Sequence, residues 1–159
     1  MSLKEQLDAD LREAMRAGLE TRKSTLRLLI TAIRNAEIPP EGAANVAARI
    51  ELDDNGVLNA IRREVKQRRD SIDAYTKANR KDLVVKEEAE LAVLAAYLPA
   101  QMSRPEIEAV AREIIQRVGA SGPADKGKVM PLIMGELRDK AEGRDINAVV
   151  TELLAGAGS

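Results

Sequence analysis

The sequence contains no cysteine, histidine, tryptophan or phenylalanine, and its aromatic residues are two tyrosines, Tyr75 and Tyr97. Without cysteine and histidine the chain has no thiolate nucleophile, no imidazole base and none of the common nitrogen and sulfur ligands of zinc. With so few aromatic rings, reading of single-stranded nucleic acid by base stacking is not expected. We therefore predict no catalytic residue, no metal site and no cofactor.

Long apolar runs are also missing. No segment approaches the roughly 18 apolar residues that a membrane-spanning helix requires. Residues 1–10 are polar and amphipathic and have no apolar core of the kind that secretory signal peptides carry. We expect neither a membrane partner nor a secretory signal, and the lack of cysteine agrees with a reducing compartment. The sequence therefore predicts a cytoplasmic protein.

The composition favours an all-α fold. Hydrophobic residues make up 45% and charged residues 32% of the 159 positions, and the long segments repeat their apolar residues with the helical period of 3.6. Pro99 provides the clearest boundary in the chain. We predict an N-terminal helical bundle at residues 1–98, including one long basic helix, and a small three-helix domain at residues 99–159.

Local capping patterns place the first helices. Ser2 followed by Glu5 is a capping box, and Gly18 is expected to end the helix that it starts. A second helix is expected after a break at Glu20 and Thr21, stopping before Pro39. Residues 39–53 are predicted to be a loop or a loose connector, with a turn or two of helix at 43–50.

A long helix is predicted from residue 54 to about 81, with Asp53 as its N-cap. One of its sides carries an apolar stripe, and Arg68 lies within that stripe. A buried guanidinium needs a carboxylate partner, and the acidic start of the following helix supplies candidates. The stripe comprises Leu58, Ile61, Val65, Ile72 and Tyr75, and the candidate acids are Glu87, Glu88 and Glu90. Asp82 is expected to cap that following helix.

The same long helix carries a concentration of positive charge, although the formal net charge of the chain is −1. Arg62, Lys66 and Arg69 follow one another at i, i+4 and i+7, which lines them along one face. Such a row suits a phosphate backbone or an acidic protein surface. A solvated helix face interleaved with acids is the alternative.

The last part of the chain predicts three short helices. Ser103 and Glu106 form a second capping box, and Gly119 is expected to end that helix. Asp125 is expected to cap the next helix, which Pro131 should distort, and Asp145 to cap the last one.

Several motifs in this order resemble the GatB/YqeY family of small bacterial proteins, and the resemblance covers essentially the whole chain. The motifs are residues 65–71, the Tyr97-Leu98-Pro99 junction, residues 118–120, residues 126–130, Gly143-Arg144, and Val150 with Leu153-Leu154. The resemblance implies a helical N-terminal domain and a small three-helix domain related to the tail of the B subunit of tRNA-dependent amidotransferase. That tail is implicated in holding tRNA, whereas the chemistry of the enzyme occurs elsewhere.

Carried over by position, the residues that match the tail motif are Lys126, Gly127, Lys128, Met130 and Arg144, and Pro131 departs from it. Two lysines flanking a glycine at a helix N-terminus also suit a phosphate contact, because free N–H groups point outward there. A glycine needed for helix packing is the alternative. The full phosphate-binding loop of nucleotide hydrolases is not present.

Three functions remain open at this stage. The first is a non-catalytic protein that binds structured RNA, with tRNA as the partner, through Arg62, Lys66, Arg69, Lys126, Gly127, Lys128 and Arg144. The second is a protein-interaction module that docks an amidotransferase or another translation protein. The third is an accessory to a carbon–nitrogen ligase with glutamine as amido donor, a label that the shared domain would carry although no nucleophile and base can be assembled here.

Overall fold

A computed structural model of the chain describes residues 1–41 and 49–157. Within these residues all regular secondary structure is helical, as the sequence predicts, and consists of α-helices and one short 3-10 helix, η1. The elements are α1 Leu3–Ala17, α2 Glu20–Ala36, α3 Asp54–Lys77, α4 Lys81–Ala95, α5 Arg104–Val118, η1 Pro123–Asp125, α6 Lys126–Leu137 and α7 Gly143–Ala157. Residues 42–48 of the expected connector lie outside the described residues.

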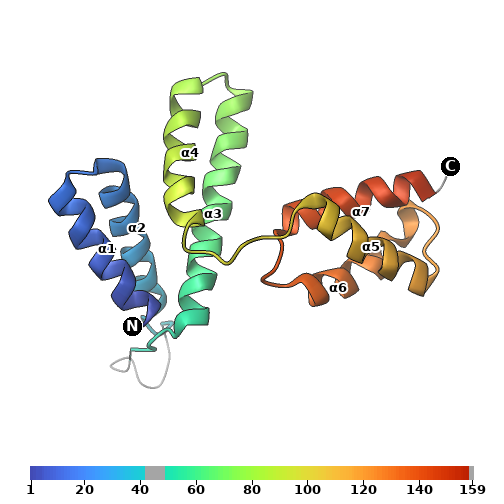
Figure 1. Ribbon diagram of the computed structural model, residues 1–159, viewed down its shortest axis with the longest axis horizontal. Helices are drawn as coiled ribbons and strands as arrows, with labels where there is room; N and C mark the ends of the chain where they lie inside the picture. The colour runs from blue at the N-terminus through green and yellow to red at the C-terminus, as the bar shows by residue number, and fades with distance from the viewer. Residues whose placement is uncertain (42–48, 158–159) are drawn as a thin grey trace. The chain divides into compact units, whose positions relative to one another are not determined.

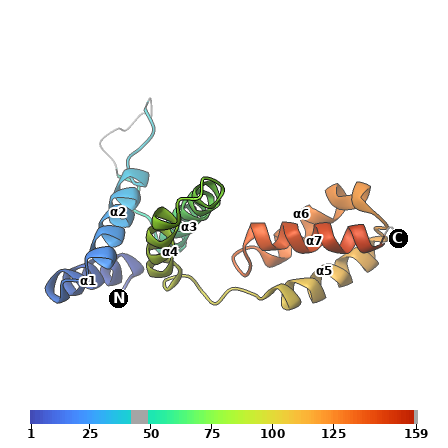
Figure 2. The ribbon, with the colours of Figure 1, turned by 90° about the horizontal axis from the view of Figure 1, so that it is seen from above.

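The chain divides into two compact units, Met1–Leu98 and Pro99–Ser159. In the first unit α1 and α2 form one helical hairpin and α3 and α4 form a second, as Figures 1 and 2 show. In the second unit α5, α6 and α7 all pack against one another.

Each unit has its own core of aliphatic side chains, as expected for a chain with two tyrosines and no other aromatic residue. The buried core of the first unit comprises Leu7, Leu26, Leu29, Ile33, Val57, Ala60, Ile61, Val65 and Leu94. The buried core of the second comprises Ile107, Ala111, Ile114, Val129, Ile133, Leu137, Ile146, Val149, Val150 and Leu154. Close packing of such small, well-defined side chains makes each core sensitive to loss of volume.

The predicted capping boxes are confirmed. Ser2 Oγ accepts the Glu5 N–H at 3.2 Å, and Glu5 Oε2 accepts the Ser2 N–H at 2.7 Å. Ser103 and Glu106 repeat this reciprocal pair. Asp53 Oδ1 accepts the Gly56 N–H at 2.8 Å and so caps α3. These caps involve residues three positions apart, which is why the sequence alone places them correctly.

Three helix boundaries differ from the sequence expectation. α2 begins at Glu20 itself, because Gly18 adopts a left-handed turn, with φ of 68°, and the Leu19 carbonyl already accepts the Lys23 N–H. α4 begins at Lys81, since the left-handed Asn79 reverses the chain before Asp82 is reached. The Asp82 carboxylate accepts two hydrogen bonds from Arg80 instead. α7 begins at Gly143, which places the expected cap Asp145 inside its first turn.

α6 runs continuously from Lys126 to Leu137 and contains Pro131, the residue that the sequence expects to distort it. Proline removes the hydrogen bond to the carbonyl four residues earlier, here that of Gly127. Both Gly127 and Pro131 lie on the exposed side of α6, where water can replace the missing donor. Asp125 occupies the N-cap position of α6, but its side chain accepts the Ser121 N–H at 2.9 Å and makes no capping bond.

Candidate nucleic-acid interface

The cationic row of α3 lies beside the buried stripe of the helix. Val57, Ile61 and Val65 are buried on the adjoining side. Lys66 is exposed, whereas Arg62 and Arg69 are half-buried at the two edges of the row. Arg62 Nη1 donates to Asn59 Oδ1 at 2.9 Å. The structure therefore places the three predicted cations along one side of α3, where Lys66 is exposed and the Nε of Arg69 is buried.

Arg68 is buried in the stripe, with 7% of its surface exposed. Its Nη1 donates to Glu64 Oε2 at 2.7 Å within α3, and its Nε lies 3.5 Å from Glu90 Oε2 of α4. The Nε–Glu90 contact is an ion pair without hydrogen-bond alignment, since that Nε has no hydrogen-bond partner. Glu90 is one of the three acids predicted as partners, and it joins the two helices of the hairpin. Arg68 is therefore a structural residue and does not belong to the cationic row.

Residues 126–128 form the first turn of α6. Lys126 is half-buried, and its Nζ donates to Thr151 Oγ1 of α7 at 3.0 Å. Lys128 keeps 75% of its side chain exposed and lies 3.4 Å from Asp125 Oδ1. The Ser121 N–H, and to a lesser extent Lys128, holds the pKa of the Asp125 carboxyl below its usual value. Lys128 is thus the outward cation of this turn, while Lys126 joins α6 to α7.

Gly127 has no packing role of the kind that the alternative interpretation requires. A methyl group placed on it would meet no atom within 4 Å. The glycine instead leaves the first turn of α6 open to close approach from outside.

Arg144 lies apart from residues 126–128. It is exposed in the first turn of α7, whereas Lys126 contacts Thr151, about two helical turns further along. Seven residues of α-helix span about 10 Å. The C-terminal residues that match the family motif therefore do not form one compact cluster.

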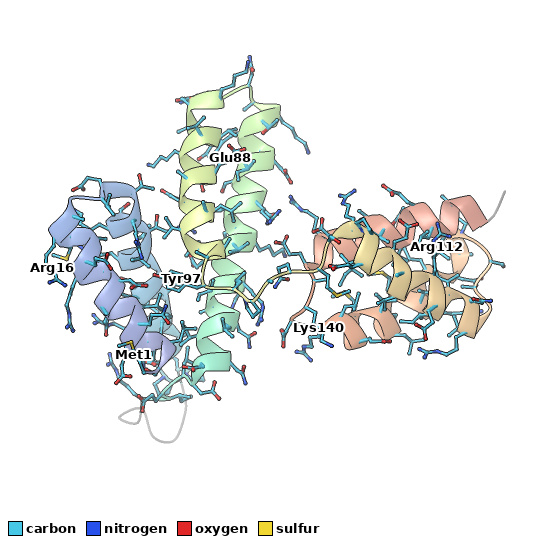
Figure 3. The ribbon with its side chains drawn as sticks, viewed as in Figure 1. Met1, Arg16, Glu88, Tyr97, Arg112 and Lys140 are labelled. Carbon is cyan, nitrogen blue, oxygen red and sulfur yellow. The ribbon has the colours of Figure 1, made fainter. Side chains whose placement is uncertain are left out.

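A polar cluster that the sequence did not predict joins α1, α2 and the end of α4. The Tyr97 hydroxyl donates to Asp10 Oδ2 at 2.5 Å, and Arg22 Nη2 lies 3.8 Å from the same oxygen. In Figure 3, Tyr97 lies beside the α1 and α2 hairpin. Burial, followed by the bond to Asp10, raises the pKa of Tyr97 to about 12, so the phenol is protonated at neutral pH. It serves as a structural donor at the junction.

Glu37 is a second contact of this kind. Its carboxylate is buried, accepts a hydrogen bond from Lys4 Nζ and also accepts the Leu52 N–H at 3.1 Å. The bond from Lys4, and then that from Leu52, keeps the pKa of Glu37 below its ordinary 4.5. No local pattern indicates this pairing, because the partners lie 33 and 15 positions away.

The part of the chain that the structure describes contains no group of three or more acidic side chains arranged to hold a metal ion. None of its helices is both long and apolar enough to cross a membrane.

These features define a class: an all-helical protein of two small units with cationic side chains presented on the outer faces of its helices. The chain belongs to the YqeY-like protein family, whose model matches residues 4–154.

Among curated relatives, a Lachancea thermotolerans protein named "Altered inheritance of mitochondria protein 41, mitochondrial" is 34% identical over 74% of this chain and 60% of its own length. The protein of the same name from Eremothecium gossypii is 37% identical over 59% of this chain and 48% of its own length. The chain thus spans about half to three fifths of the length of these relatives.

The prediction of a cytoplasmic protein is contradicted by these relatives, which are named as mitochondrial. The sequence argument failed because the lack of an apolar segment excludes only secretory signals, and mitochondrial targeting segments are amphipathic. A lack of cysteine does not distinguish two reducing compartments.

Proposed function

We propose that this protein is a non-catalytic helical protein that binds structured RNA, with tRNA as the partner, through the phosphate backbone. The observation that carries the proposal is the cationic row of Arg62, Lys66 and Arg69 on α3. In this proposal, the row contacts the RNA first, and Lys128 with Gly127 at the start of α6 adds a further phosphate contact. In this proposal the protein acts in the mitochondrion, the location that the names of its relatives give.

The spacing of the row suits a phosphate backbone. Seven residues of helix separate Arg62 from Arg69, so the row spans about 10 Å. Consecutive phosphates of a nucleic-acid strand lie several ångströms apart, so a row of this length can meet two or three of them. Arginine at the two edges favours phosphate, because its planar guanidinium donates two parallel hydrogen bonds.

The protein would recognise RNA by the shape and charge of its phosphate backbone. The two tyrosines are unsuited to base stacking, since Tyr97 is bound to Asp10 and Tyr75 is half-buried on α3. Contacts to phosphate position a protein on RNA without reading its sequence. We therefore expect preference for folded RNA over unstructured strands, with little dependence on base identity.

A role as a protein-interaction module remains the second candidate, because Leu132 and Met134 of α6 are 45% and 41% exposed. The third interpretation, an accessory to a carbon–nitrogen ligase, draws no support from the geometry of the described residues.

The test is a titration of the full chain with total tRNA, and with an RNA duplex as control, at several salt concentrations. The triple variant R62E/K66E/R69E should lose binding, because it reverses the whole row. The matched control is R12E/R16E/R27E, which changes the net charge equally at three exposed arginines of α1 and α2. A second variant, K126E/K128E, measures the contribution of the C-terminal unit.

If the row neutralises three phosphates, the logarithm of affinity should fall with the logarithm of salt with a slope of about −3, from about 0.9 per phosphate in a duplex. The proposal is wrong if the wild type fails to bind tRNA at low salt. It is also wrong if the α3 triple and its control weaken binding equally, because net charge alone would then explain the effect.

A further inference from the structure

The first turn of α3 contains the one asparagine of the sequence that precedes a glycine, Asn55 followed by Gly56. In such a pair the backbone nitrogen of the glycine can attack the side-chain amide of the asparagine, because glycine has no side chain to stand in the way. Asn55 is exposed, so water reaches it. The other asparagines precede alanine, valine or arginine. Asn55 is therefore the position at which this chain is chemically most prone to deamidation.

Close packing favours glycine at position 56. A Cβ atom added there would lie 3.0 Å from Leu52 Cδ2 and 3.2 Å from Leu52 Cβ. Leu52 precedes the N-cap residue Asp53, and its side chain packs against the core of the first unit. A larger residue at position 56 would therefore have to displace Leu52. Packing thus keeps a glycine next to Asn55, and with it the reactive pair.

In the folded chain the attacking nitrogen is held by the helix cap. The Gly56 N–H donates to Asp53 Oδ1 at 2.8 Å. The Leu3 N–H, at the start of α1, donates to Asp54 Oδ1 at 2.9 Å and ties the same turn to a second helix. These bonds hold Asn55 in the helical backbone conformation, and ring closure requires its backbone to leave that conformation. The closed first turn of α3 should therefore protect Asn55.

We propose that Asn55 is a deamidation site and that the Asp53 cap controls its rate. When the first turn of α3 opens, the Gly56 N–H loses its proton to hydroxide and the nitrogen forms a bond to Cγ of Asn55. The Cγ–Nδ2 bond breaks, and the amide nitrogen takes a proton from water and leaves as ammonia. Water then opens the resulting five-membered imide at either carbonyl, which gives aspartate or isoaspartate. Each conversion consumes one water and releases one ammonia.

The two products differ in their effect on α3. Aspartate keeps the normal backbone and adds a negative charge at a helix N-terminus, where the macrodipole favours it. Isoaspartate routes the main chain through the side-chain carbon and so inserts one extra carbon atom between Asp54 and Gly56. The helical bond of 2.9 Å from the Val57 N–H to the Asp53 carbonyl spans this insertion and is disrupted. Isoaspartate therefore undoes the first turn of α3 and its contact with α1.

The test incubates the full chain at mildly alkaline pH and follows Asn55 by peptide mapping with mass spectrometry, with fragmentation that distinguishes aspartate from isoaspartate. The same chain unfolded in guanidinium chloride gives the rate without the cap. Asp53→Ala removes the cap, and Asp53→Ser replaces it with another side chain that caps helices. Asp145→Ala is the matched control, because Asp145 is an acidic residue in the first turn of α7.

We expect Asn55 to deamidate about tenfold or more slowly in the folded wild type than in the unfolded chain, because the reaction waits for local opening. Asp53→Ala should raise the folded rate about fivefold, which corresponds to about 1 kcal/mol of lost capping. Asp53→Ser and Asp145→Ala should each stay within about twofold of the wild type. Deamidation at Asn59, one turn further along α3, should not rise, which would show that Asp53→Ala acts on the first turn and not through global unfolding.

The products are compared after ion exchange separates them from the unmodified chain. The isoaspartate form should melt at a lower temperature than the wild type. The variant Asn55→Asp carries the same added charge on a normal backbone and should melt at the wild-type temperature. Equal melting of the isoaspartate form and Asn55→Asp would overturn the expected disruption of α3.

Three results would overturn the role of the cap. Asn55 stays intact in the unfolded chain, it reacts equally fast in the folded and unfolded chains, or Asp53→Ala leaves its rate unchanged. An equal rise in Asp53→Ser and Asp53→Ala would also overturn it, because the charge of Asp53 and not its capping bond would then control the rate. None of these outcomes depends on RNA binding by α3.

Discussion

The Tyr97 hydroxyl and the Asp10 carboxylate, 87 positions apart in the sequence, form a hydrogen bond of 2.5 Å. This bond joins the end of α4 to α1, and Arg22 of α2 lies near the same carboxylate oxygen. Tyr97 also packs against the core of the first unit. Tyr97, two positions before Pro99, is therefore held by both apolar and polar contacts.

Tyr97→Phe should lower the free energy of unfolding by about 1–2 kcal/mol, because it removes a hydrogen bond to a charged, mostly buried carboxylate. Urea denaturation measures the change, and Tyr75→Phe, on the half-buried part of α3, is the control. An equal effect of both variants would show that the bond to Asp10 contributes little.

The same bond predicts a dependence on alkaline pH. The folded pKa of Tyr97, about 12, lies above the usual 10.0, so the folded state retains its proton where the unfolded chain loses it. Its contribution to stability is complete below pH 10 and is lost as the pH rises toward 12. The difference in the free energy of unfolding between the wild type and Tyr97→Phe should therefore become smaller as the pH rises from 10 toward 12. A difference that does not change with pH would contradict the assignment.

Glu37 predicts a dependence at the acidic end. Its folded pKa is lowered below 4.5, so its stabilising contribution is present above that value and is lost as the pH falls further. Glu37→Gln should destabilise the protein by about 1–3 kcal/mol at neutral pH, because it replaces the buried carboxylate that accepts the hydrogen bond from Lys4 with a neutral amide. The loss in the free energy of unfolding caused by Glu37→Gln should become smaller in acid. Glu88→Gln, at an exposed position of α4, is the control and should leave the free energy of unfolding unchanged.

Arg68 tests the buried ion pairs of the α3 and α4 hairpin. Arg68→Ala leaves Glu64 and Glu90 without their shared cation and should cost about 3 kcal/mol. Arg63→Ala, at an exposed position of the same helix, is the control and should stay within about 0.5 kcal/mol of wild type. Combining Arg68→Met with Glu90→Leu should recover part of the loss, because an apolar pair replaces a broken ion pair. Failure of this double variant to improve on Arg68→Ala would count against the assignment.

Replacing either of two glycines of the second unit with alanine should change the stability of the protein, in opposite directions at the two positions. Gly119 has a φ of 70° at the end of α5, so Gly119→Ala should cost about 1 kcal/mol through backbone strain. Gly135 lies within α6 with open space around it, so Gly135→Ala should gain up to about 1 kcal/mol. Thermal denaturation of the two variants compares them directly, and a loss of stability in Gly135→Ala would show that the helix needs glycine for its own packing.

Part of the candidate site follows from helical periodicity alone. Arg62, Lys66 and Arg69 share a face because their spacing matches the helical repeat, and that face adjoins the buried stripe, so Lys66 is exposed while the two arginines are half-buried. Residues 126–128 begin a helix because the turn before them contains Gly122 and Pro123. Arg144 could not be placed relative to them from sequence, because its position depends on how α7 packs against α6.

The sequence by itself determined the helices and their best-defined ends. Periodicity specifies which side of each helix is apolar, and the boxes of Ser2 and Ser103 bond residues three positions apart, so both signals are local. Asp82 and Asp145 carry the same local signal yet do not cap, because turns formed just before them start the helices early. Only the tertiary structure decided that Glu90 faces Arg68, that Lys4 reaches Glu37 and that Tyr97 meets Asp10. Those partners are distant in sequence, and packing of the cores, which brings the helices together, selects them from many chemically equivalent acids and bases.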